Sequence, residues 1–391
     1  MVGVPTSMVV IQPTGFCNID CVYCYLPNRS DKHVIALETV ERVFAELFEG
    51  ARSAPELTVV WHAGEPLVVS PDFYRAAFAM IDRLKPDHVC VKHSFQTNGM
   101  LINDEWCDLF LAHDVGVGVS VDGPAAIHDA NRKTRSGKGT HAQTMAGIAK
   151  LRARSVPFHV ISVLSRASLV DPQELLDFYL DAGIEQVCFN VEESEGSHVS
   201  TLFEMRDLPE AYRAFLTAFW QRAQASGRIR FVREIDLAIG RIFRPEEAEG
   251  HNIQVEPMAM LNVDSRGEVS TFSPEFLGLK DERYGDFVFG NINADSLDTI
   301  MARCLASPLY RDIKAGVAAC EAECPYFSVC GGGAPVNKLF ENGRLDSTET
   351  RYCTLAHKVP TDLVINAFDG LVAERAQQAS AFSSQREPQI V

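Results

Sequence analysis

The chain has 391 residues, of which 46% are hydrophobic and 23% are charged, a composition typical of soluble globular proteins. The formal net charge is −16 and the basic residues form no dense cluster, which argues against nucleic-acid binding. No apolar run is long enough to span a membrane, and the N-terminus lacks the pattern of a secretory signal. We therefore expect a cytoplasmic protein with two or three domains, or with one large α/β domain and an appendage.

The first half of the chain alternates short apolar runs with amphipathic segments. The apolar runs predict six buried strands, at residues 8–12, 57–61, 90–96, 115–121, 157–164 and 187–191. Helical periodicity and capping residues predict helices at residues 37–50, 71–84 and 141–154, and directly after Asn103 and Asp171. A polar loop is expected from residue 122 to Gly139. Six β-then-α units predict an α/β fold with a parallel sheet, as an open, partial (β/α)6 barrel whose chemistry collects at the carboxyl ends of the strands.

Composition divides the chain into four parts. Residues 1–200 hold the predicted barrel, and residues 201–253 are predicted to form a helical bridge. Residues 254–355 are rich in Gly, Pro and Cys, and a turn at 264–267 between two short apolar runs predicts a β-hairpin. Residues 356–391 predict a C-terminal helix followed, from about Ala376, by a disordered polar tail.

Seven of the eleven cysteines gather in two clusters. In a reducing compartment such clusters favour metal ligation over disulfides. The first cluster, Cys17, Cys21 and Cys24, follows the first strand. Three thiolates fit either a zinc site completed by His33 or an iron–sulfur cube with one open iron. The second cluster supplies four thiolates, which close either a zinc site or a cube; its members are Cys320, Cys324, Cys330 and Cys353.

The four remaining cysteines are isolated in apolar or helical surroundings. They are expected to act as small buried hydrophobic residues. These cysteines are Cys90, Cys107, Cys188 and Cys304.

An aromatic residue, Tyr23, stands immediately before Cys24, giving the pattern Cys-x3-Cys-x-aromatic-Cys. This pattern resembles the radical S-adenosylmethionine (SAM) enzymes. The resemblance implies a radical SAM barrel, in which a [4Fe–4S] cluster binds SAM through its open iron and cleaves it to a 5′-deoxyadenosyl radical. The segment 63–66 resembles the Gly-Gly-Glu-Pro motif of the family, with alanine in place of the first glycine.

The same resemblance implies a set of SAM-binding residues near the strand ends. Glu65 would contact the ammonium of SAM, Arg132 its carboxylate, and Leu164, with Val163, would flank the adenine. Taken singly, Glu65 predicts an exposed loop acid, residues 122–124 a turn, and Arg132 part of a solvated basic loop. Their positions after separate strands favour a shared site. The full set is Tyr23, Gly64, Glu65, Gln96, Asn98, Ser120, Asp122, Arg132 and Leu164.

The second cysteine cluster resembles the SPASM extension of peptide-modifying radical SAM enzymes, whose full pattern has seven cysteines and two auxiliary clusters. This chain has no cysteine in the predicted hairpin, and Ala334 occupies the position of another ligand. The resemblance therefore implies a SPASM-like domain with one auxiliary [4Fe–4S] cluster, and two clusters in the whole chain.

Several segments, among them FSPEFLG and CPYFSVCGGGAPVNKLFENG, resemble one subgroup over roughly residues 5–370. These are the cyclophane-forming maturases associated with glycine-rich-repeat peptides. The resemblance implies a carbon–carbon crosslink between an aromatic ring and a side-chain carbon, usually Cβ, of a ribosomal precursor peptide. An external one-electron reductant such as flavodoxin or ferredoxin would be required. Glu275 is the candidate base for rearomatisation, although it also fits a role in capping the following segment.

Two alternatives remain open from the sequence. An anaerobic sulfatase-type maturase, which forms formylglycine, would use the same barrel. A zinc-stabilised binding scaffold would use the cysteines without redox chemistry. Because the first strand begins near Met8, we expect leader recognition to rely on this body or on another protein.

Overall fold

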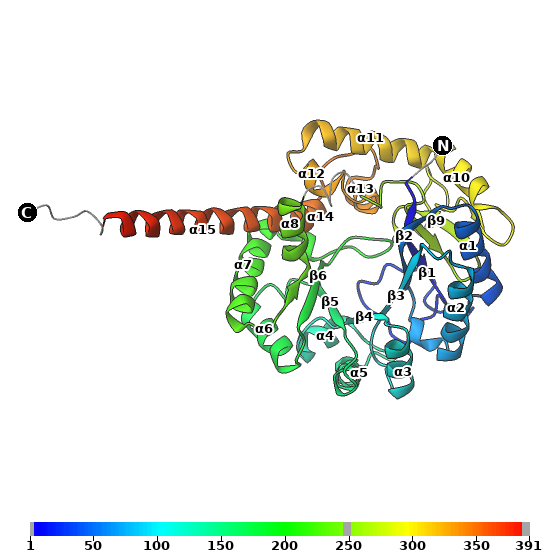
Figure 1. The fold of residues 1–391 in the computed structure, drawn as a ribbon, viewed down its shortest axis with the longest axis horizontal. Coiled ribbons are helices and arrows are strands. Elements are labelled where there is room, and N and C mark those ends of the chain that lie inside the picture. Colours follow the sequence, from blue (N-terminus) through cyan, green and yellow to red (C-terminus); the bar gives the residue numbers. More distant parts are fainter. Residues whose placement is uncertain (1–3, 245–251, 385–391) are drawn as a thin grey trace, which may run out of the picture.

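A ten-stranded sheet forms the framework of the computed structural model, which describes residues 4–244 and 252–384 (Figure 1). The spatial order is β10-β9-β8-β1-β2-β3-β4-β5-β6-β7, and β1 to β7 are parallel to their neighbours. All six predicted strands are confirmed, as Thr6–Ile11 (β1), Ser53–Trp61 (β2), Cys90–Thr97 (β3), Gly116–Ser120 (β4), His159–Leu164 (β5) and Gln186–Val191 (β6). In the described chain β7 and β10 end the sheet without pairing to each other, so the sheet is open.

Helices cover the outer face of the parallel strands (Figure 1). The predicted caps are confirmed, since the side chain of Asn103 accepts a hydrogen bond from the Trp106 N–H and that of Asp171 from the Glu174 N–H. The helices are Leu37–Glu49 (α1), Pro71–Leu84 (α2), Asp104–Ala112 (α3), Ala125–Asn131 (α4), His141–Ala153 (α5) and Pro172–Asp181 (α6).

The prediction of an uninterrupted polar loop up to Gly139 is wrong, because α4 lies within it. Three of its seven residues are alanine, the strongest helix former, and the buried side chain of His128 anchors this helix to the barrel.

The segment between barrel and C-terminal lobe is itself attached to the sheet. It contains α7 (Leu208–Ser226), β7 (Phe231–Val232) and α8 (Arg233–Phe243). Strand β7 pairs with β6, so the parallel sheet extends into the region where the sequence predicted a purely helical bridge.

The predicted hairpin of the C-terminal third is confirmed, as β8 (Met260–Val263) and β9 (Glu268–Thr271). Strand β8 pairs in parallel with β1, and β10 (Gly290–Asn291) adds an antiparallel edge. The remaining lobe lies over one end of the sheet (Figure 1). It is helical, with α10 (Leu297–Ala306), α11 (Pro308–Glu323), α12 (Phe327–Cys330), α13 (Pro335–Asn342) and α14 (Arg351–Cys353).

A π-helical turn, η4 (Thr354–Lys358), leads into α15 (Val359–Ser384), which projects from the body (Figure 1). The helix continues past Ala376, where the sequence predicted disorder, because residues 377–384 include alanine and glutamine, which favour helix, and no proline or glycine. The last seven residues of the predicted tail, 385–391, lie outside the described residues. In the described chain no helix combines the length and apolarity needed to cross a bilayer.

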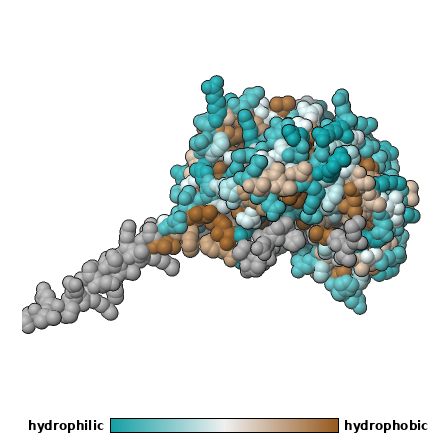
Figure 2. Space-filling view, turned by 90° about the horizontal axis from the view of Figure 1, so that it is seen from above, coloured by the Kyte–Doolittle hydropathy of each residue, from teal (hydrophilic) through white to brown (hydrophobic). Residues whose placement is uncertain are grey.

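Apolar side chains gather on the surface where α15 leaves the body (Figure 2). The rings of Phe243 in α8 and Phe368 in α15 meet at a centroid distance of 5.2 Å, and both are half-exposed. Leu237 of α8 and Ile365 and Leu371 of α15 are also exposed.

Side chains alternate between the two faces of the parallel strands. Trp61 and Phe95 contact Tyr74 of α2, with ring centroids 5.1 and 4.8 Å away, so these positions face the helices. The alternate positions of the same strands, such as Gln96 next to Phe95, face the interior of the partial barrel. Three isolated cysteines, Cys107, Cys188 and Cys304, are buried as predicted, whereas Cys90 is exposed at the first position of β3.

Candidate active site

The loop that follows β1 carries the first three cysteines at the carboxyl end of the sheet. Cys17, Cys21 and Cys24 are all partly exposed. The loop is held by backbone hydrogen bonds to the end of α4 and the residues after it: the Asp20 N–H donates to the Lys133 carbonyl at 2.6 Å, and the Val22 N–H to the Asn131 carbonyl at 2.9 Å. The basic stretch around Arg132, which taken singly predicts a solvated loop, is therefore part of the candidate site.

Polar donors point at two of the three sulfurs. Asn98 Nδ2 lies 3.9 Å from Cys17 Sγ, and Arg132 Nη1 lies 4.0 Å from Cys21 Sγ. Donors of this kind stabilise thiolates that ligate iron–sulfur clusters. The three sulfurs and their donors therefore fit a cluster with one open position.

Glu65 is buried and ties together the loops after β2 and β3. Its Oε1 accepts hydrogen bonds from the Leu67 N–H at 3.0 Å and the Thr97 hydroxyl at 2.6 Å. Its Oε2 accepts from the Asn98 N–H at 2.8 Å. Burial raises the pKa of Glu65 to about 7, against the lowering effect of these bonds. The carboxylate thus acts within the protein as a clamp between two loops.

The two residues before Glu65 both have left-handed backbone angles, with φ of +67° at Ala63 and +66° at Gly64. A Cβ at Gly64 would lie 2.4 Å from the Thr14 carbonyl oxygen, so only glycine fits there. At Ala63 this conformation costs about 1 kcal/mol relative to glycine. That cost explains why the related motif has glycine at both positions.

Asp122, completely buried at the end of β4, joins three elements. Its Oδ1 accepts from Arg132 Nη2 at 3.0 Å and from the Val163 N–H at 3.0 Å, and its Oδ2 accepts from the Tyr23 hydroxyl. The guanidinium of Arg132 also lies 5.3 Å from the centre of the Tyr23 ring. Arg132 Nε is buried without a partner in the described residues, which leaves one donor free for a ligand.

A second set of hydrogen bonds, made by His128 and Thr140, supports Asp122 and Arg132. The Asp122 N–H donates to His128 Nδ1 at 3.4 Å, and His128 Nε2 lies 3.0 Å from Thr140 Oγ1. The Thr140 hydroxyl donates to the Arg132 carbonyl at 3.0 Å. Burial lowers the pKa of His128 to about 4, so the imidazole is neutral at pH 7.

The remaining SAM-site candidates separate into two groups. Gln96 and Ser120 face the barrel interior and contact each other, Nε2 to Oγ, at 2.9 Å. Leu164 is instead completely buried in the hydrophobic core on the helix-facing side of β5. Its neighbour Val163 is partly exposed on the inner face, so Val163 is better placed to contact a ligand.

The four cysteines of the second cluster surround one cavity of about 150 Å³ in the C-terminal lobe. Ala334, Lys338 and Lys358 line the same cavity. The loop beside it is held by Asn252, whose Nδ2 donates to the Cys330 and Gly333 carbonyls at 3.1 and 2.7 Å. A cavity lined by four cysteines fits a four-thiolate cluster.

Among the described residues, no three His, Cys, Asp or Glu side chains lie close enough together to hold a single metal ion. In a cube each thiolate binds a different iron, so the ligands are spaced more widely than around one ion. His33, the alternative zinc ligand, is exposed and donates its backbone N–H to Asp31.

Three partly buried carboxylates form a group that the sequence analysis missed. Glu193 accepts from Asn337 Nδ2 at 2.5 Å and shares a side-chain hydrogen bond with Glu195, and Glu275 lies close enough to influence both. Burial raises the pKa of Glu193 to about 8 and that of Glu275 to about 7. Glu275 Oε2 is buried with no partner in the described chain. The acidic run after β6 was the available sequence signal, because it lies at the same edge as the other strand-end residues.

Tyr25 connects this carboxylate group to the first cysteine loop. Burial raises its pKa, with further contributions from Glu275, Glu195 and Cys24. Its hydroxyl lies 3.5 Å from His62 Nε2, and burial lowers the pKa of His62 to about 4. The carboxylates therefore lie near Tyr25 in the first cysteine loop, and Glu193 also contacts α13 of the C-terminal lobe through Asn337.

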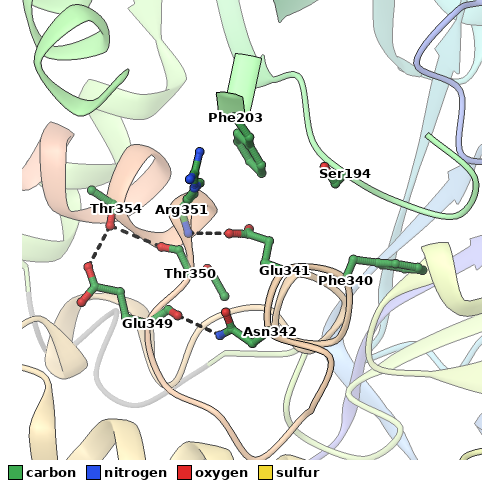
Figure 3. Close-up of a pocket in the computed structure, with 9 residues that line it drawn as sticks. All are labelled: Ser194, Phe203, Phe340, Glu341, Asn342, Glu349, Thr350, Arg351 and Thr354. Atoms are coloured by element: carbon green, nitrogen blue, oxygen red, sulfur yellow. Dashed lines mark hydrogen bonds between the residues drawn. The ribbon is translucent and has the colours of Figure 1, made fainter. Parts of the chain in front are cut away.

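A larger open pocket of about 410 Å³ lies next to the four-cysteine cavity (Figure 3). Glu349 and Thr350 line both spaces. Within the pocket, Glu341 accepts from the Arg351 N–H at 2.5 Å, which fixes α14 against α13. The other lining residues are Ser194, Phe203, Phe340, Asn342 and Thr354.

Comparison with known proteins identifies related sequences. The sequence profile of the Radical SAM superfamily matches residues 11–179. An uncharacterized protein of Synechocystis sp. is 41% identical over 369 residues, which cover 93% of this chain and 92% of that protein. A serine-type anaerobic sulfatase-maturating enzyme of Klebsiella aerogenes is 29% identical over 270 residues, 65% of each chain.

Solved structures share the fold over most of the chain. The structure of anSMEcpe with bound AdoMet has a TM-score of 0.73 at 19% identity, covering 94% of this chain and 98% of that one. Streptococcus suis SuiB bound to precursor peptide SuiA has a TM-score of 0.59 at 16% identity, covering 90% and 76%. At these identities the likeness concerns the fold.

Proposed function

Residues 11–179 match the Radical SAM superfamily, and on this premise we propose that the chain is a peptide maturase that forms cyclophanes. It would join an aromatic ring carbon to a side-chain carbon, usually Cβ, of a nearby residue in a ribosomal precursor peptide. The observation that carries the proposal is the cavity lined by the four cysteines of the second cluster, with Ala334 in its wall. This arrangement supports a SPASM-like lobe with one auxiliary cluster, as the subgroup resemblance implies.

Cys17, Cys21 and Cys24 would hold the SAM-binding [4Fe–4S] cluster, and the cysteines of the C-terminal cavity the auxiliary one. When bound, these groups supply a 5′-deoxyadenosyl radical that removes a substrate hydrogen atom, and an acceptor for the electron released later. Arg132 offers its unpartnered Nε to the carboxylate of SAM, while Asp122 and Tyr23 fix its orientation. Glu65 holds the loops around the ammonium of SAM in place.

Glu275 is the proposed base for rearomatisation. Its buried, unpartnered Oε2 can accept a proton from the ring carbon, and a pKa of about 7 suits that transfer near neutral pH. Glu193 and Glu195 share a hydrogen bond and so retain a proton between them, which limits the negative charge in this group.

The pocket beside the four-cysteine cavity is the proposed entry for the peptide (Figure 3). Phe203 and Phe340 offer apolar contacts, and polar groups from Glu341 to Thr354 line the rest of the opening. SuiB, which shares the fold, is described as bound to a precursor peptide, and this supports a peptide substrate. Electrons for SAM cleavage would come from a flavodoxin or ferredoxin.

A second candidate is an anaerobic sulfatase-type maturase. It is favoured by the relatives of that name, which include serine-type and cysteine-type enzymes. Such an enzyme would oxidise one serine or cysteine of a folded or nascent sulfatase to formylglycine and would need the same SAM site.

Co-expression with a candidate precursor peptide tests the proposal. A cyclophane lowers the peptide mass by two hydrogen atoms, blocks fragmentation between the joined residues and leaves no aldehyde. A serine-derived formylglycine has the same mass change but reacts with a hydrazide. A hydrazide-reactive product from a sulfatase peptide, with an unmodified precursor, would contradict the first proposal and support the second.

A further inference from the structure

Lys338 in α13 is a lysine with its ammonium inside the protein. The residue is 3% exposed, and its Nζ donates to the Gly316 carbonyl at 3.0 Å and to Cys320 Sγ at 3.3 Å. In the described residues, no carboxylate forms an ion pair with it. A buried ammonium is costly unless a negative charge lies nearby. The group directly in front of it is a cysteine sulfur in the wall of the four-cysteine cavity.

The surrounding structure makes room for this lysine. Gly316 in α11 has no side chain, and a Cβ there would lie 3.1 Å from Lys338 Nζ and 2.3 Å from the Leu345 carbonyl oxygen. Any larger residue at position 316 would therefore displace the ammonium or the loop that covers it. The contact between Lys338 and Cys320 thus depends on close packing of α11 against α13.

The other lysine of the cavity has its charge compensated. Lys358 Nζ forms an ion pair with Glu349 at 2.7 Å and lies 5.6 Å from the ring centre of Tyr326. Of the two lysines that line this cavity, Lys338 is therefore the one whose positive charge is available to interact with a bound cluster.

We propose that Lys338 raises the reduction potential of the auxiliary cluster by hydrogen bonding to its Cys320 ligand. Reduction adds one electron to the cluster, with no bond formed or broken, so it increases the negative charge that faces the ammonium. A buried positive charge and a hydrogen bond to a ligating sulfur both favour the more negative state. In the proposed reaction the electron comes from the crosslinked substrate radical, and Lys338 makes the cluster a better acceptor. The inference rests on the proposed function only in requiring the auxiliary cluster.

The test is a redox titration of the full-length, reconstituted holoenzyme, followed by electron paramagnetic resonance with dithionite as reductant. Lys338→Met should lower the equilibrium constant for one-electron reduction of the auxiliary cluster about tenfold, which corresponds to about 59 mV. Lys338→Gln, which keeps a donor without the charge, should give an intermediate value. Lys358→Met should shift the potential less, and Lys314→Met, at an exposed position of α11, should leave it unchanged.

Repeating the titration with all three cysteines of the first cluster replaced by alanine isolates the auxiliary signal. An unchanged potential in both Lys338 variants, at full iron content, would overturn the proposal and leave Lys338 a structural residue. If the Lys338→Met protein fails to retain the auxiliary cluster, the reduction potential of the Lys338→Gln protein decides between the two outcomes. A wild-type protein without an auxiliary cluster would also overturn it. Failure of the proposed function would be seen separately. In that case no crosslinked peptide forms, although the reduction potential of the auxiliary cluster still depends on Lys338.

Discussion

Arg132 forms an ion pair with Asp122 at 3.0 Å, and both side chains are shielded from solvent. The same guanidinium lies 4.0 Å from Cys21 Sγ. The pair therefore links the end of β4 to the first cysteine loop, and any change in it acts on both the fold and the site.

Asp122→Asn should lower the free energy of unfolding by about 3–5 kcal/mol, because it leaves Arg132 as a buried charge without its partner. SAM affinity should fall as well, since Arg132 loses its fixed orientation. Urea unfolding of the cluster-free protein and SAM titration of the reconstituted protein measure the two effects.

Glu41→Gln is the matched control, because Glu41 and Arg83 form an exposed ion pair at 3.1 Å. Loss of such a pair costs less than about 1 kcal/mol. Equal destabilisation by the two variants would contradict the role given to the buried pair.

Replacing any one of Cys17, Cys21 and Cys24 by alanine should abolish the formation of 5′-deoxyadenosine, because the SAM-binding cluster loses a ligand. The fold should be retained, since the loop lies outside the hydrophobic core. Chromatography of the nucleoside product and iron analysis measure the result, and Cys90→Ala, at an exposed isolated cysteine, serves as control. Continued SAM cleavage in one of the three variants would exclude that cysteine as a ligand.

Glu65→Gln should weaken SAM binding roughly ten- to hundredfold, the range expected for loss of hydrogen bonds to a charged group. The amide nitrogen would oppose either the Asn98 N–H or the Leu67 N–H, so the loops after β2 and β3 would separate. Calorimetric titration under anaerobic conditions measures the affinity. Thr97→Ser, which keeps the hydroxyl donor, should bind SAM nearly as well as the wild type; comparable losses in the two variants would argue against the clamp.

Glu193 should make the stability of the cluster-free protein fall with rising pH. Its pKa is about 8 in the fold, raised by burial, against about 4.3 in an unfolded chain. Between these values the folded state holds a proton that the unfolded state has released, so stability decreases as pH rises from about 4.3 to about 8. In Glu193→Gln this slope should be shallower, as measured by urea unfolding at several pH values.

Glu204→Gln, at an exposed position shortly after β6, is the control and should leave the slope as it is. A Glu193→Gln protein whose stability depends on pH as steeply as the wild type would contradict a Glu193 that is protonated in the folded state.

The barrel was predictable because its signals are local. Apolar runs of strand length, helical periodicity and the caps at Asn103 and Asp171 each lie within a few neighbouring residues. The cysteine spacing was equally local. The continuation of α15 past Ala376 was missed because polar composition outweighed helix propensity in that prediction.

The contacts within the site were not predictable, since they join residues far apart in the chain. Glu65 is satisfied by Thr97 and Asn98, and neither partner can be identified from the motif around Glu65. Lys338 is likewise not identified by its neighbours in the chain. It is buried only because Gly316, on another helix, leaves space for its ammonium.

Strand β8 pairs with β1 along residues 8–11, so the C-terminal third shares the sheet of the barrel. Removal of that third would expose the backbone N–H and C=O groups of β1 as an unprotected edge, prone to aggregation. The lobe is therefore not an exchangeable module. A fusion that replaces the rest of the C-terminal lobe must therefore keep the β8–β9 hairpin and join the new sequence after Thr271.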